Sequence, residues 1–78
     1  MTDEETRRAR ILNLADVAEM LGITVPTART LVQQGEIIGF QIGGRGMWRV
    51  ESVELDNYIQ RKKDEAVQRR KEEQAEAN

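Results

Sequence analysis

The chain has 78 residues and contains neither cysteine nor histidine. A chain this short forms one small core at most. Without cysteine and histidine it lacks disulfides, thiolate ligands, the commonest metal ligand and the usual general base. We therefore expect a single domain that is not an enzyme, has no catalytic residue, and binds no cofactor and no metal.

The apolar residues are spread too thinly for a membrane segment. No apolar run approaches the roughly 18 residues that cross a bilayer. Residues Met1 to Arg10 lack the apolar stretch of a signal peptide. The expected protein is soluble and cytoplasmic, without membrane contact.

The distribution of apolar residues divides the chain into three parts. Most of them fall in residues 11–59, which we expect to form the folded domain. Residues 1–10 are expected to be a flexible N-terminal arm, and residues 60–78 a charged helical extension that frays and is disordered from Gln74 onward. The central part carries six acids and three arginines, a net charge of −3, so its overall charge does not indicate nucleic-acid binding.

Two short helices are predicted at the start of the domain. Asn13 is placed to cap a helix over residues 14–21, which Gly22 would end. After a minimal turn Thr24 can cap a second helix, which should stop at Gly35. Apolar residues at helical spacing give each helix one buried side.

A β-hairpin and a third helix are predicted next. From Glu36 the apolar residues alternate with other residues, which predicts a strand that ends near Ile42. The glycine-rich residues 43–46 suit a tight turn, and residues 47–50 form the second strand, with Trp48 expected in the core. Ser52 is placed to cap a helix that faces the core. The alternating apolar residues are Ile38, Phe40, Ile42, Trp48 and Val50, and the core-facing residues of the third helix are Leu55, Tyr58 and Ile59.

The order helix, turn, helix, hairpin, helix is that of a winged helix-turn-helix domain. The stretch from Leu12 to Thr24 closely resembles the opening of the excisionase-type DNA-binding domains, a small branch of the MerR-like winged helices. The resemblance continues to Ile59 and so covers nearly all of the foldable region. The other matching segments are Leu31 to Ile37, Gln41 to Gly46, Trp48 to Val50 and Leu55 to Ile59.

The resemblance implies a mainly α fold with a small β-hairpin wing, and selective binding to double-stranded DNA without an enzymatic step. Members look like transcription regulators or recombination accessory factors, which would place this protein in the cytoplasm with the nucleoid. The second helix would enter the major groove, and the wing would contact the backbone or the minor groove. The sequence departs from the pattern at Val25 and Gln33, where members often carry Arg or Lys.

The second helix and the hairpin carry the candidate DNA-binding residues. The outer side of the second helix has no acid, and its hydroxyl, amide and guanidinium groups suit base edges or phosphates, while Val25 or Pro26 can contact a thymine methyl. Arg45 at the hairpin tip and Arg49 on the face opposite Trp48 suit phosphates or the minor groove. A solvated polar helix and an exposed turn are the plain alternatives. The predicted set is Val25, Pro26, Thr27, Arg29, Thr30, Gln33, Arg45 and Arg49.

Other functions fit the same fold. The acidic domain and the low pI of about 5.1 suit a protein-protein adaptor on a winged-helix scaffold. The charged extension suits the DNA-recognition subunit of a phage packaging machine. A single small unit makes few phosphate contacts, so the DNA-binding hypothesis predicts a homodimer or a cooperative assembly on DNA. The basic triplets 61–63 and 69–71 can contact DNA, a protein partner or only solvent.

Overall fold

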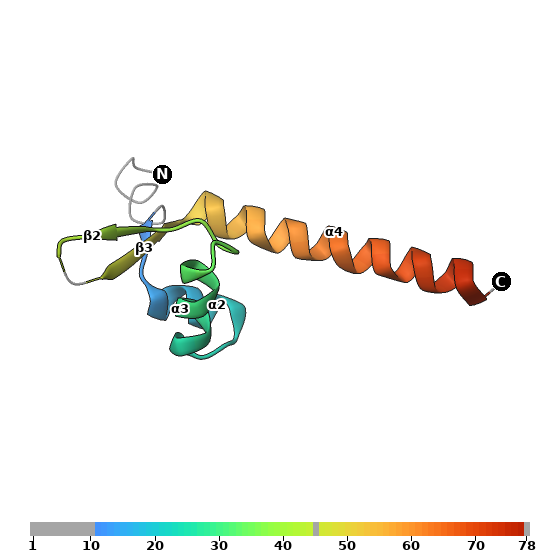
Figure 1. The fold of residues 1–78 in the computed structure, drawn as a ribbon, viewed down its shortest axis with the longest axis horizontal. Coiled ribbons are helices and arrows are strands. Elements are labelled where there is room, and N and C mark those ends of the chain that lie inside the picture. Colours follow the sequence, from blue (N-terminus) through green and yellow to red (C-terminus); the bar gives the residue numbers. More distant parts are fainter. Residues whose placement is uncertain (1–10, 45, 78) are drawn as a thin grey trace, which may run out of the picture.

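A computed structural model describes residues 11–44 and 46–77 (Figure 1). Residues 1–10, Arg45 and Asn78 lie outside the described part, so the predicted N-terminal arm and one candidate arginine do too. The elements in chain order are β1 (Ile11–Leu12), α2 (Leu14–Leu21), α3 (Val25–Gln33), β2 (Phe40–Ile42), β3 (Met47–Glu51) and α4 (Ser52–Ala77).

Both predicted helix starts are confirmed. At the start of α2 the Asp16 amide donates to Asn13 Oδ1 over 2.7 Å, and the Asn13 amide donates to Asp16 Oδ2 over 3.1 Å. This reciprocal pair satisfies two backbone donors that the helix itself leaves unpaired. Gly22 ends α2 with a φ of 69°. At the start of α3 the Thr27 amide donates to Thr24 Oγ1 over 3.3 Å.

The chain after α3 differs from the prediction. The amides of Glu36 and Ile37 both donate to the Leu31 carbonyl, over 2.9 and 3.2 Å, so the backbone stays tied to the end of α3. This path inserts the Ile37 side chain into the core, where it is fully buried. The prediction of a strand from Glu36 was therefore wrong for its first residues, and β2 begins only at Phe40.

The sheet has three antiparallel strands in the order β1-β3-β2. Leu12 pairs with Val50, and Gln41 pairs with Trp48, so these residues share the face that packs on the helices. Trp48 packs against the core, as predicted. The strand β1 was not predicted from the sequence, because two residues are too few for an alternating pattern.

The opposite face of the sheet is open and largely apolar. The register places Phe40 beside Arg49, and Ile42 beside Met47. Ile11 lies at the β1 end of the same face, because it pairs with Glu51. The side chains of Ile11, Phe40, Ile42 and Met47 are 40–47% exposed, and we call these four residues the outer sheet face.

The core lies between the helices and the inner face of the sheet. Each main element except β2 contributes at least one side chain that is buried, and no polar or charged side chain is buried among the described residues. Leu55 anchors α4 in this core, while Tyr58 and Ile59 pack at its edge, as predicted. The fully buried side chains are Val17, Ala28, Ile37, Val50 and Leu55.

The helix α4 starts at Ser52 directly after β3, so Ser52 is its first residue and not the residue before it. From Gln60 to Ala75 its side chains are exposed, and α4 extends away from the body on the side opposite the hairpin (Figure 1). The helix continues to Ala77, whereas the sequence analysis expected disorder from Gln74. Gln, Ala and Glu favour helix even without packing. Within the described residues no helix is both long and apolar enough to span a membrane.

These elements form the predicted mainly α winged helix-turn-helix. The helices α2 and α3 are the two helices of the motif, and the hairpin β2–β3 is the wing. Gly39 lies where α3 meets the wing. A Cβ at Gly39 would come within 2.7 Å of Val32 Cγ1 and 3.0 Å of the Arg49 carbonyl oxygen. The close approach of α3 to the hairpin therefore needs glycine at this position.

Gly39→Ala is expected to lower the free energy of unfolding by about 1–3 kcal/mol, the usual cost of overpacking a filled site. Urea denaturation measures this change. Gly44→Ala is the matched control, because an added Cβ there has nothing within 4 Å and the φ of Gly44 is not positive. Equal stability of the two variants would show that the contact between α3 and the wing is loose.

Candidate nucleic-acid interface

The core fixes which side of α3 is free. Ala28 and Val32 are buried and Leu31 is half-buried, so the inner side of α3 packs on the rest of the domain. With 100° between successive residues, the remaining side chains point outward. All six candidates on this helix are exposed, and we call them the α3 surface. They are Val25, Pro26, Thr27, Arg29, Thr30 and Gln33.

The two threonines of the α3 surface have local hydrogen bonds. Thr30 Oγ1 donates to the Pro26 carbonyl over 3.1 Å, and Thr27 Oγ1 lies 2.8 Å from Thr24 Oγ1. A hydroxyl whose proton is already donated still offers lone pairs. Thr30 is therefore poised as an acceptor, which suits the exocyclic amines of adenine and cytosine in a major groove.

Arg29 and Gln33 have no such internal contact. Among the described residues, neither side chain makes a hydrogen bond or an ion pair. Their polar groups can therefore meet a ligand without first breaking a bond to residues 11–44 or 46–77. A guanidinium and an amide are the groups that read guanine and adenine edges most specifically.

The wing arginines stand apart from the α3 surface. Arg49 is half-buried, and its Nη1 donates to the Trp48 carbonyl over 2.8 Å. Because Arg49 pairs with Phe40, its side chain starts on the sheet face that points away from the helices. Arg45 lies outside the described residues. The structure thus brings six of the eight candidates together and leaves Arg49 on another face.

The charge of the segment that contains α3 and the wing differs from that of the whole domain. Residues 24–50 contain three arginines and only one acid, Glu36. The acids Asp16 and Glu19 belong to α2, and the remaining acids of the domain lie at the end of β3 or in α4. An acidic domain therefore presents a locally basic segment.

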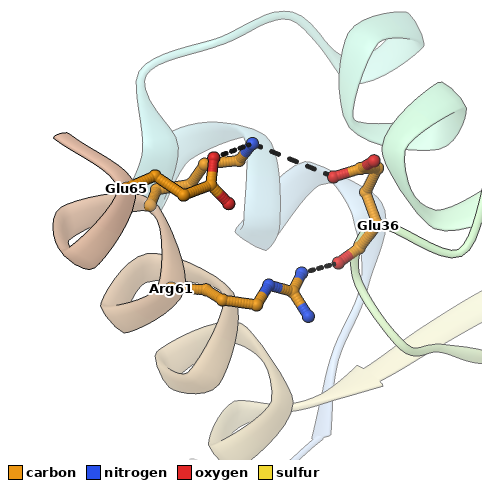
Figure 2. A network of polar contacts seen from close by, with 4 residues as sticks. Glu36, Arg61 and Glu65 are labelled. Atoms are coloured by element: carbon orange, nitrogen blue, oxygen red, sulfur yellow. Dashed lines mark hydrogen bonds and ion pairs between the residues drawn. The ribbon is translucent and has the colours of Figure 1, made fainter. Parts of the chain in front are cut away.

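A contact between α4 and Glu36, three residues after the end of α3, was not predicted from the sequence. Arg61 Nη2 donates to the Glu36 carbonyl, and Lys62 Nζ lies 3.9 Å from Glu36 Oε2 and 3.3 Å from Glu65 Oε1 (Figure 2). We call Arg61 and Lys62 the α4 clasp. The spacing of Lys62 and Glu65 is readable in the sequence, but a contact across 25 residues leaves no periodic signal.

The match to a known protein family covers the whole winged domain. A model of the helix-turn-helix domain family matches residues 11–63, which extend from β1 into the first turns of α4. No curated protein and no solved structure gives a significant match. The match covers about two thirds of the chain and confirms the resemblance inferred from the sequence.

Proposed function

The chain belongs to the helix-turn-helix domain family, and on this premise we propose that it is a small regulator that binds double-stranded DNA through the α3 surface. The observation that carries the proposal is the α3 surface itself. Every candidate on it is exposed, it contains no acid, and the opposite side of α3 is held in the core. The role we propose is a transcription regulator or an excisionase-like recombination accessory factor.

The dimensions of α3 suit a major groove. Nine residues make a helix about 14 Å long and, with side chains, 10–12 Å wide, and the groove is about 12 Å wide. In such a complex Arg29 contacts a guanine or a phosphate, Thr30 accepts from a base amine, and Val25 or Pro26 contacts a thymine methyl. Thr27 and Gln33 supply the remaining polar contacts.

The wing supplies the second part of the proposed interface. Arg45, between two glycines in the sequence, contacts the backbone or the minor groove. Arg49 joins only after its bond to the Trp48 carbonyl rearranges, because the side chain starts on the far face of the sheet. We therefore assign Arg49 the smaller share of the binding free energy.

The number of cations limits the affinity of one copy. The segment 24–50 offers three arginines, and each phosphate contact adds only a modest salt-dependent amount. Two copies on neighbouring half-sites would double the contacts. We therefore propose a homodimer or a cooperative assembly on DNA.

A salt titration tests the proposed function. The affinity for a duplex is expected to fall as salt rises, and Arg45→Ala is expected to reduce the slope of log K against log salt by about 1 without lowering thermal stability. Fluorescence anisotropy with random and genomic duplexes measures both. Binding that is undetectable at low ionic strength, or that does not depend on salt, would refute the proposal.

One observation favours a second function, that of a protein-binding adaptor. The outer sheet face exposes four large apolar side chains, which is typical of a surface that contacts another protein. The adaptor hypothesis predicts that Phe40→Ser abolishes partner binding and that no duplex binds. The DNA hypothesis predicts instead that Phe40→Ser leaves the salt slope unchanged.

A further inference from the structure

The end of α3 carries an acid at an unfavourable place. Glu36 follows the helix closely, and its amide donates to the Leu31 carbonyl over 2.9 Å. The C-terminus of a helix bears a partial negative charge, so a carboxylate there is disfavoured and a cation is favoured. The last turn of α3 contains no basic residue of its own.

The same acid also opposes the proposed function. Glu36 is the one acid of residues 24–50, and α3 is only about 14 Å long. The screening length is about 10 Å at 0.1 M salt and about 30 Å at 0.01 M. A phosphate bound anywhere on the α3 surface would therefore feel an uncompensated charge on Glu36, most strongly at low salt.

The helix α4 brings two cations to this acid. Arg61 donates to the Glu36 carbonyl, and Lys62 Nζ lies 3.9 Å from the Glu36 carboxylate (Figure 2). The two cations reach Glu36 from one turn of α4. Lys62 Nζ also lies 3.3 Å from Glu65 Oε1, so the two cations balance the charges of Glu36 and Glu65 together.

Tyr58 helps to hold the two cations in place. The Arg61 guanidinium carbon lies 5.8 Å and Lys62 Nζ 5.7 Å from the centre of the Tyr58 ring, within the range of a cation–π contact. Tyr58 itself packs against the core. The clasp is thus anchored to the folded domain, although both cations belong to the charged extension.

The exposure of the clasp argues against a role in stability. The side chains of Lys62 and Glu36 are 46% and 47% exposed, and exposed ion pairs of this kind stabilise a fold very little. The ion pair still changes the local charge, even though it adds little to the free energy of unfolding. The structure therefore fits a pair whose function lies in where it puts charge.

We propose that Arg61 and Lys62 are positioning residues for DNA binding, which neutralise the Glu36 carboxylate without touching DNA themselves. This inference rests on the proposed function. It gives the first turns of α4 a role in the interface that the α3 surface alone does not reveal. It also explains why Glu36, just after α3, does not prevent DNA from binding to the α3 surface.

A double-mutant cycle on the full chain tests the inference. The two variants are Glu36→Gln and the joint change Arg61→Gln with Lys62→Gln. Losing the clasp is expected to weaken duplex binding about two- to fivefold at low salt, the range of exposed charge interactions. Glu36→Gln alone should change binding little, because the clasp already neutralises this acid. In the Glu36→Gln background the loss of the clasp should have almost no effect.

The joint change Arg70→Gln with Lys71→Gln is the matched control. It removes an adjacent arginine and lysine from the same helix, beyond the contacts of Glu36. The control substitutions should change duplex affinity by the same factor whether position 36 is Glu or Gln. Restored binding in the combined clasp and Glu36→Gln variant would also show that this protein is folded.

The outcomes of these binding experiments test the inference separately from the proposed DNA-binding function. If removal of Arg61 and Lys62 weakens duplex binding, and Glu36→Gln restores that binding, the inference is supported. If the loss of affinity is equally large with Gln at position 36, the inference is overturned, because Arg61 and Lys62 would then contact phosphate directly. Unchanged affinity without the clasp overturns it as well. Absence of duplex binding by the unaltered chain refutes the proposed function, and the inference falls with it.

Discussion

Ile37→Ala is expected to lower the free energy of unfolding by about 2–5 kcal/mol, the usual cost of emptying a buried aliphatic site. Ile37 is fully buried among residues from α2, α3, β3 and α4. The domain is small, and a protein of this size has only about 5–15 kcal/mol of stability to lose. Urea denaturation followed by the fluorescence of Trp48, the only tryptophan, measures the change.

The adjacent Ile38 provides the matched control. Its side chain is 61% exposed, against 0% for Ile37. Ile38→Ala should therefore change the free energy of unfolding by no more than about 0.5 kcal/mol, as is usual at surface positions. A larger loss at Ile38 than at Ile37 would mean that the chain runs as a strand from Glu36 with Ile38 on the covered face.

These two isoleucines also show where sequence patterns mislead. Ile38, Phe40 and Ile42 alternate like a strand, yet all three side chains are exposed, and the buried residue is Ile37. The period of two is genuine for β2, but it marks the outer sheet face and not the core. Periodicity tells which residues share a face, and only the packing of the rest decides which face is covered.

Local signals predicted the helices well. The Asn13 cap and the glycine after α2 act through atoms within a few residues, so the sequence states them almost completely. Contacts between distant segments were not predictable. The pairing of β1 with β3 and the contact of Arg61 with Glu36 join residues far apart in the chain, and nothing in either segment alone specifies its partner.

The candidate site was predictable only in part. The exposed side of α3 follows from its helical period, and the structure places those six residues on one surface. The position of Arg49 on the far face of the sheet follows from the strand register, but its bond to the Trp48 carbonyl does not. DNA contact by each of these residues remains a prediction.

Arg29→Ala is expected to weaken duplex binding about fivefold or more at low salt, since a good contact to a base is worth about 1–3 kcal/mol. Arg29 is the one cation of α3 and is exposed, so its loss removes the main charge of the α3 surface. Anisotropy titrations with a fixed duplex measure the effect. The fold should be unchanged, because Arg29 is exposed and its side chain makes no hydrogen bond or ion pair with another described residue.

Arg69→Ala is the control for Arg29. Arg69 is equally exposed, but it belongs to the part of α4 that extends away from the domain (Figure 1). Its loss should change affinity less than about twofold, within the range of a single exposed charge. A larger effect at Arg69 than at Arg29 would move the interface from α3 to α4.

The proposed function depends most on DNA contact at the α3 surface. Titration of isotope-labelled protein with a duplex, followed by backbone amide chemical shifts, locates the contact residue by residue. DNA contact at the α3 surface would place the largest shifts on residues 25–34 and at the hairpin, with small shifts on residues 66–77. Shifts confined to the outer sheet face or to the far end of α4, with α3 unaffected, would contradict it.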